Sequence, residues 1–160
     1  MPRPFEKNDT PFMLDDNKRV GENCISTVND VRLLTFRQLG DEHGHLIAAE
    51  CGKDIPFDVK RVFYIYGTDK DTVRGRHANI KSEFVLISVT GSVRIKVADV
   101  FEEERIFNLD RLNIGLYLPK MIWKDMYEFS PGSVLLVLSN ELYDEGEYVR
   151  NWDAFRKDGK

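Results

Sequence analysis

Short runs of β-branched and aromatic residues recur along this chain at intervals of about ten residues, and residues that favour turns separate them. Such runs are typical of strands, and their regular spacing is typical of an all-β sandwich or barrel. The clearest runs cover residues 62–66, 84–89, 92–97, 113–118 and 134–138. Only the tail, around residues 143–156, has a helical pattern. We therefore predict an all-β fold, an antiparallel β-barrel of the jelly-roll type, with a short C-terminal helical segment.

A chain of 160 residues suits a single domain that buries roughly 70% of the surface of its unfolded chain. We assign residues 23–160 to this domain. Residues 1–22 combine several prolines with many charges, so we predict a flexible or loosely docked N-terminal extension there. That extension has no secretory signal pattern, and no apolar run approaches the ~20 residues that span a bilayer. We expect a cytoplasmic protein without a membrane partner.

The net charge of −4 argues against a general nucleic-acid binder, which needs many contacts from Lys and Arg to phosphates. A local basic cluster nevertheless lies between the first two predicted strands, in a segment with glycine that we predict to be a loop. The candidate anion-binding side chains in and before this loop are Arg61, Arg74, Arg76 and Lys81. Guanidinium forks and an ammonium group suit a pyrophosphate. The alternative for this cluster is a solvated surface loop.

The spacing of His77, Asn79 and Glu83 resembles the first motif of the cupin barrels, in which ligands alternate along one strand and project to one face. A second cupin motif would end at Lys124, where a metal-binding cupin has histidine. A protonated lysine offers no lone pair to a metal, and asparagine replaces histidine at position 79. We therefore predict a cupin that holds no metal.

Longer segments carry a more specific resemblance. They are I-P-F-D-V-K-R-V-F-Y-I at 55–65, R-G-R-H-A at 74–78, G-L-Y-L-P at 115–119, W-K-D-M at 123–126 and the long stretch 134–155. On these segments the chain resembles the dTDP-4-keto-6-deoxyglucose 3,4-ketoisomerases, small WxcM-like cupins of bacterial deoxysugar biosynthesis. The resemblance extends from about Asn29 to the C-terminus. Family members carry R-G-x-H-A-H and W-H-E-M, so Asn79 and Lys124 depart from the family pattern.

The resemblance implies an isomerase that moves the keto group of a dTDP-4-keto-6-deoxyhexose from C4 to C3 through an enediol, with no cofactor. It also implies a homodimer that exchanges N-terminal strands, and a role in surface polysaccharides such as the O-antigen of lipopolysaccharide. Two other functions stay open: a catalytically impaired relative that binds a nucleotide-sugar, and a nucleotide-sugar epimerase. The sequence does not predict the gluco or galacto configuration of the product.

A 3,4-ketoisomerase needs a base for the C3 proton, and histidine has a suitable pKa. His77 is our candidate base, with a structural histidine as the alternative. Asn79 could donate a hydrogen bond to the enediolate oxygen. His43 or His45 could replace the missing second imidazole, although they lie beside a predicted turn and an exposed loop is the alternative. By the resemblance, His43 lies at a variable family position that influences the face of the sugar that is reprotonated.

Two further candidates come from strand periodicity and from the second motif. Tyr64 and Tyr66 share one face of their predicted strand, while Phe63 and Ile65 share the other. Tyr64 is a candidate for the site face, with a core or a surface position as alternatives. Lys124 stands where the family has an imidazole, and we count it among the candidate substrate-binding residues.

Overall fold

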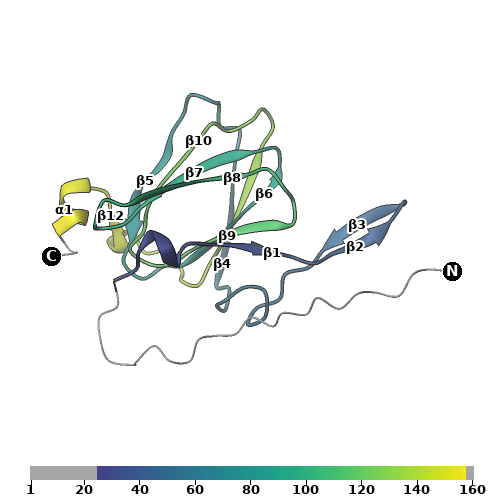
Figure 1. Ribbon diagram of the computed structural model, residues 1–160, viewed down its shortest axis with the longest axis horizontal. Coiled ribbons are helices and arrows are strands. Elements are labelled where there is room, and N and C mark those ends of the chain that lie inside the picture. Colours follow the sequence, from purple (N-terminus) through teal and green to yellow (C-terminus); the bar gives the residue numbers. More distant parts are fainter. Residues whose placement is uncertain (1–24, 158–160) are drawn as a thin grey trace.

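The structure is a computed structural model, and it describes residues 25–157. The fold is built on two five-stranded sheets whose strand pairs are antiparallel (Figure 1). The first sheet has the order β1-β9-β6-β11-β4 and comprises β1 (Arg32–Thr35), β9 (Ile114–Leu118), β6 (Phe84–Thr90), β11 (Val134–Ser139) and β4 (Arg61–Tyr66). The second has the order β12-β5-β10-β7-β8 and comprises β12 (Tyr148–Val149), β5 (Arg74–Asn79), β10 (Trp123–Tyr127), β7 (Val93–Ala98) and β8 (Glu104–Leu109).

The remaining elements are short. They are the 3-10 helices η1 (Val28–Asp30) and η2 (Glu145–Glu147), the hairpin of β2 (Gln38–Asp41) and β3 (Gly44–Ile47), and the helix α1 (Trp152–Lys157). The predicted antiparallel all-β fold with a short C-terminal helix is therefore confirmed. The predicted extension, residues 1–22, lies outside the described residues. No helix within residues 25–157 combines the length and apolar character needed to cross a membrane.

The main core lies between the two sheets, and β6 shows why the first sheet is so apolar. Residues 84–88 of β6 are all buried, because this central strand is covered on both faces. Leu86 faces the core between the sheets. Val85 faces the opposite way and packs in a second cluster with Phe36 and Ile55. The continuous apolar run in the sequence thus reflects burial on both faces.

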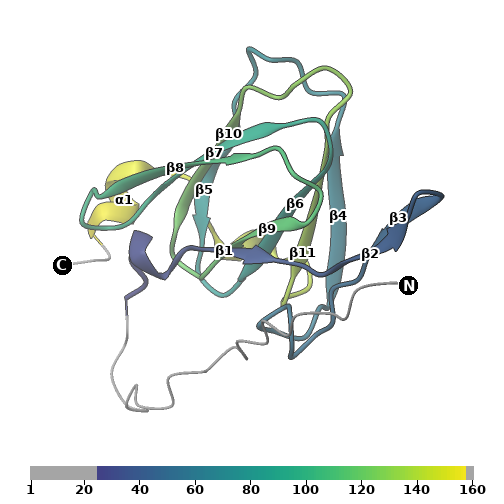
Figure 2. The ribbon, with the colours of Figure 1, turned by 45° about the vertical axis from the view of Figure 1, so that its right-hand side comes forward.

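The β2–β3 hairpin extends away from the two sheets, whereas α1 lies at the opposite end of the molecule (Figures 1 and 2). Leu39 and Leu46 pair across this hairpin and are both exposed. At the other end, Trp123, Trp152 and Phe155 form a cluster of aromatic rings that fastens α1 to the second sheet. Among residues 25–157, the hairpin therefore presents an exposed apolar surface.

The segment that we predicted as a basic loop is strand β5, which pairs with β10 on one side and β12 on the other. Lys124 pairs with His77 and Asp125 with Gly75, so Arg76 is an extra, bulged residue. The backbone is left-handed at Gly75 (φ 88°) and Arg76 (φ 58°). A Cβ atom on Gly75 would lie 2.6 Å from the carbonyl oxygen of Lys124, so only glycine fits. The sequence of β5 is too polar to be predicted as a strand, and pairing with β10 and β12 stabilises it.

Candidate active site

A cavity of about 190 Å³ lies between the two sheets. Its apolar wall comes from β4, β6 and β11 of the first sheet, and its polar wall comes from the second sheet. The apolar side chains from the first sheet are Phe63, Ile65, Phe84, Leu86 and Val137. The second sheet contributes Arg74, His77, Lys124 and Tyr148 as the polar groups, and Met126 as an apolar one. Apolar walls with a few convergent polar groups are typical of small-molecule sites.

His77 and Lys124 are directly opposite one another in the β5–β10 pair, so their side chains project to the same face and both line the cavity. The Nδ1 atom of His77 lies 2.9 Å from the carbonyl oxygen of Gly75. Because a carbonyl oxygen only accepts, Nδ1 carries the hydrogen and Nε2 keeps its lone pair. The Tyr148 ring packs against the imidazole, with 4.8 Å between the ring centroids. The bulge in β5 thus presents a base of defined tautomer to the cavity.

The environment keeps His77 neutral. Burial and then the nearby charge of Lys124 lower its pKa from 6.5 to about 4. At neutral pH the imidazole is therefore unprotonated and able to accept a proton from a carbon acid.

Lys124 is a buried cation, with only 6% of its surface exposed. Its ammonium group lies 4.8 Å from the centre of the Phe84 ring and donates a hydrogen bond of 2.6 Å to Oδ1 of Asn79. Burial lowers the pKa of Lys124 to about 7, while the negative charge of Glu147 acts in the opposite direction. Lys124 is thus poised between its charged and neutral forms near neutral pH.

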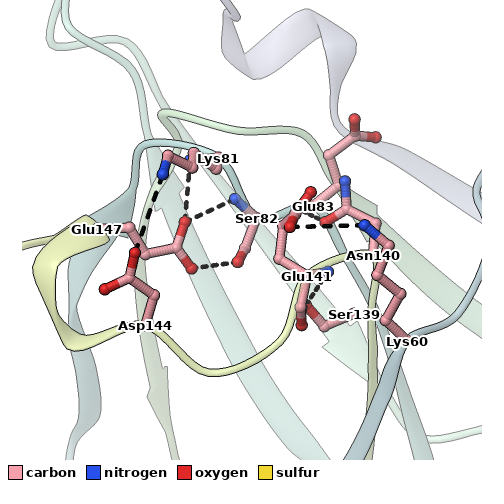
Figure 3. A network of polar contacts seen from close by, with 9 residues as sticks. All are labelled: Lys60, Lys81, Ser82, Glu83, Ser139, Asn140, Glu141, Asp144 and Glu147. Carbon is pink, nitrogen blue, oxygen red and sulfur yellow. Dashed lines mark hydrogen bonds and ion pairs between the residues drawn. The ribbon is translucent and has the colours of Figure 1, made fainter.

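Glu147 is a residue of this site that we did not predict from the sequence. Its carboxylate is buried and accepts hydrogen bonds from the Lys81 and Ser82 backbone amides, the Ser82 hydroxyl and the Asn79 amide. Figure 3 shows Glu147 facing Ser82 and the backbone of Lys81. Burial alone would raise the pKa of Glu147, but these hydrogen bonds outweigh it and hold the pKa below its ordinary value. Glu147 therefore stays ionised behind the polar wall.

Asn79 does not meet our expectation of contact with the enediolate. Its side chain is 1% exposed and does not line the cavity. Its Oδ1 accepts from Lys124, and its Nδ2 donates to Glu147 over 3.2 Å. An ammonium group must donate and a carboxylate must accept, so these partners settle which way the amide points. The structure therefore places Asn79 behind Lys124, as a bridge to Glu147.

Tyr64 and His43 lie away from the cavity. Strand β4 turns Phe63 and Ile65 inward, so the alternation leaves Tyr64 on the outer face with 62% of its surface exposed. His43 lies in the turn between β2 and β3, where its side chain is 84% exposed and Glu42 is its ion-pair partner. Neither residue reaches His77 within this chain.

Two of the predicted anion-binding arginines lie at or near the cavity. Arg74 lines it, and its Nε atom donates to the Thr68 hydroxyl over 2.8 Å. Arg61 is half-buried, with its guanidinium 5.1 Å from the Phe63 ring and 5.6 Å from the Tyr143 ring. Its Nε and Nη2 atoms are buried and have no hydrogen-bond partner among the described residues. A buried guanidinium in this state is suited to an anionic ligand.

The other two basic candidates remain at the surface. Arg76 is the exposed, bulged residue of β5. Lys81 is exposed and forms an ion pair of 3.9 Å with Asp144, as Figure 3 shows. Neither lines the cavity, so the structure divides the basic cluster into two inner and two outer residues.

The donor set does not fit a transition metal. Of the cupin-like positions, only His77 and Glu83 retain ligand side chains, and Glu83 accepts a hydrogen bond of 2.6 Å from Tyr117 outside the cavity. Within residues 25–157, no three or more His, Cys, Asp or Glu side chains are grouped to hold a metal ion. Lys124 stands where a further ligand would be needed. A metal-free site remains our prediction.

Comparisons with known proteins show the family to which the chain belongs. The family model described as "FdtA: WxcM-like, C-terminal" matches residues 29–160. The TDP-4-oxo-6-deoxy-alpha-D-glucose-3,4-oxoisomerase of Aneurinibacillus thermoaerophilus is 38% identical over 128 residues, which are 79% of this chain and 90% of that protein.

Solved structures show the same relationship. The sugar 3,4-ketoisomerase QdtA of Thermoanaerobacterium thermosaccharolyticum, in complex with TDP, is 43% identical with a TM-score of 0.79, covering 82% of this chain and 95% of that one. A variant of that enzyme has been solved with TDP-4-keto-6-deoxyglucose. The TDP-quinovose 3,4-ketoisomerase WlaRB of Campylobacter jejuni is 41% identical with a TM-score of 0.78, covering 81% of this chain and 99% of that one. The predicted resemblance is confirmed: this chain belongs to the FdtA-type, WxcM-like family that includes these sugar 3,4-ketoisomerases.

Proposed function

We propose that this protein is a 3,4-ketoisomerase that converts a dTDP-4-keto-6-deoxyhexose into its 3-keto isomer through an enediol. The observation that carries the proposal is the neutral imidazole of His77, with Nε2 unprotonated, in a cavity between two sheets. The protein would act in the cytoplasm, and its product would enter a surface polysaccharide such as an O-antigen. The relatives named above support this substrate class.

The chemistry follows from the acidity of the substrate. A ketone at C4 acidifies the hydrogen on C3, so a neutral imidazole can remove it. A low pKa makes His77 a weak base, but its conjugate acid is correspondingly ready to return the proton to C4. Phe84, Leu86 and Val137 line the cavity with apolar surface, so the polar groups that face the intermediate come from the opposite wall.

The nucleotide part of the substrate carries a pyrophosphate, and the inner arginines supply the matching charge. Arg61 has buried nitrogen atoms without a partner among the described residues, and Arg74 lines the cavity. Bidentate hydrogen bonds from guanidinium groups to phosphate oxygens would fix the sugar relative to His77.

Exchange with solvent deuterium tests the proposed function. Incubation of the protein with dTDP-4-keto-6-deoxyglucose in deuterated water should produce the 3-keto sugar with deuterium at C4. Reversal of the reaction should introduce deuterium at C3 of the remaining substrate, and NMR follows both changes. Binding with neither exchange nor formation of the 3-keto sugar would instead identify a protein that holds the nucleotide-sugar without converting it. Exchange at C5 as well as C3 would indicate an epimerase, because the C4 ketone acidifies both neighbouring positions.

A homodimer is part of the same proposal. Val62, Tyr64 and Tyr66 expose 56%, 62% and 68% of their surfaces on the outer face of β4, which is an edge strand. Leu39 and Leu46 add exposed apolar surface on the projecting hairpin. A second copy of the chain would cover this surface and the strand edge. Light scattering should give about twice the chain mass of 18.6 kDa, and a monomer mass would refute the dimer.

A further inference from the structure

The polar wall of the cavity contains a second group that is able to transfer protons. Lys124 is the only lysine that lines the cavity among the described residues, and its ammonium group is held there by Asn79. The side chain is more than nine-tenths buried and is directly opposite His77 in the β5–β10 pair. Removing an ammonium group from water costs free energy. A lysine that is buried beside an apolar wall is therefore a candidate for binding a ligand or taking part in a reaction.

The isomerisation moves two hydrogens, and one imidazole accounts for only one of them. The carbon-bound hydrogen leaves C3 and a hydrogen arrives on C4. The hydroxyl hydrogen leaves O3 and a hydrogen arrives on O4. Asn79 cannot carry this second proton, because an amide neither gains nor loses protons near neutral pH.

We infer that Lys124 is the catalytic residue that moves the hydroxyl proton, giving a proton to O4 and taking one from O3, while His77 moves the carbon-bound proton. This inference rests on the proposed function. Asn79 and Glu147 are positioning residues: Glu147 holds the Asn79 amide, and the amide oxygen holds the ammonium group.

The steps balance without any further reactant. His77 takes the C3 proton, the C–H electron pair forms the C3–C4 double bond, and the carbonyl electrons of C4 pass to O4, which receives a proton from the Lys124 ammonium. In the second half, the neutral amine of Lys124 takes the O3 proton and the C3 carbonyl forms. The double-bond electrons then take the proton from the His77 imidazolium onto C4. Both side chains end in the forms in which they began.

The arrangement predicts a window of activity in pH. His77 must be neutral, so kcat/KM falls as the pH drops through about 4. Lys124 must be protonated, so kcat/KM also falls as the pH rises through about 7. The other charged or titratable groups around Lys124 are Arg74 from β5, Tyr148 from β12 and Glu147 from η2. Its neighbour on β7, Val97, is apolar.

Two substitutions of Lys124 separate its charge from its ability to release a proton. Lys124→Met keeps the shape of the stem, and we expect kcat/KM to fall by roughly 10²–10³-fold. Lys124→Arg keeps a positive charge but releases no proton near neutral pH, so kcat/KM should fall by a similar factor and the remaining activity should show no fall above about pH 7. TDP should bind both variants as it binds the unmodified protein, because the arginines hold the pyrophosphate.

A matched control is Lys96→Met on β7, where the lysine lies outside the cavity in an ion pair of 2.7 Å with Glu104. This variant should keep the rate and the pH profile. The inference would be overturned if kcat/KM of Lys124→Arg still fell above about pH 7. Full activity in Lys124→Met, or loss of its TDP binding, would also overturn it. A substrate adduct trapped on Lys124 by borohydride would also overturn it, since the lysine would then act covalently. Absence of both C3 exchange and 3-keto product with the unmodified protein would overturn the proposed function itself.

Discussion

His77→Ala is expected to abolish exchange of the C3 hydrogen, with a loss of at least about 10²–10⁴-fold in rate. The imidazole lines the cavity with Nε2 unprotonated, and no other histidine of the described chain reaches that cavity. Alanine leaves space but no base. TDP affinity should stay nearly unchanged, because the guanidinium groups of Arg61 and Arg74 are untouched. Exchange measured by NMR at pH 6 to 7 gives the comparison.

His45→Ala is the matched control, since His45 is an exposed residue of β3 on the projecting hairpin. This variant should exchange C3 at the rate of the unmodified protein. If His77→Ala kept its rate while His45→Ala lost it, the base would come from the hairpin, and our assignment of the site would be wrong.

The strand pattern in the sequence predicted much of the fold. The runs at 62–66, 84–89 and 134–138 correspond to β4 (Arg61–Tyr66), β6 (Phe84–Thr90) and β11 (Val134–Ser139) within one or two residues. These strands contribute to the buried apolar core, so their sequences are rich in apolar residues.

Strands β5 and β10 have no such apolar pattern, although they hold His77 and Lys124, the two groups that we propose transfer protons. Their sequences, R-G-R-H-A-N and W-K-D-M-Y, mix charged and apolar residues, because one face lines a polar cavity wall. Pairing between strands distant in sequence stabilises them, and local propensity does not report such pairing. The bulge at Arg76 further disturbs the alternation on which the prediction depends.

The candidate site was predicted in part for the same reason. His77 came from a motif, and the exposed position of Tyr64 was one of the alternatives that strand alternation left open. Glu147 escaped detection because its partners Asn79 and Ser82 are 68 and 65 residues away in the sequence. A buried carboxylate that binds backbone amides has no local signature, since an exposed glutamate looks the same in the sequence.

Asn79 and Lys124 look like losses when each is compared with the family pattern alone. In the structure they form one unit, in which the ammonium group donates to the amide and the amide donates to Glu147. With Asn79 and Lys124 in place of the two family imidazoles, the cavity keeps one titratable group, the Lys124 amine. Asn79 is its hydrogen-bond partner. The two departures are best understood as a coupled change, because either residue alone would leave a buried polar group without its partner.

Glu147→Gln is expected to destabilise the protein by about 3 kcal/mol and to shrink its range of active pH. Both carboxylate oxygens accept hydrogen bonds, one from the Lys81 and Ser82 amides and the other from the Ser82 hydroxyl and Asn79. A glutamine amide must turn its NH₂ group toward one of these sets of donors, which leaves buried donors unpaired. For a chain of this size the melting temperature should fall by roughly 6–12 °C.

The effect should depend on pH in a defined direction. The folded-state pKa of Glu147 is lowered, so the carboxylate stabilises the fold above its unfolded pKa, and this contribution is lost as the pH falls through the folded pKa. The difference in melting temperature between the unmodified protein and Glu147→Gln should therefore shrink in acid.

The same substitution should also act on catalysis through Lys124. The charge of Glu147 raises the pKa of Lys124, so its removal lowers that pKa and moves the alkaline fall of kcat/KM below about pH 7. Glu145→Gln, an exposed neighbour in η2, is the matched control and should change neither quantity. A Glu147→Gln variant that melts like the unmodified protein would show that the buried hydrogen bonds contribute little. If kcat/KM of Glu147→Gln fell at the same alkaline pH as in the unmodified protein, the charge of Glu147 would have no effect on the pKa of Lys124.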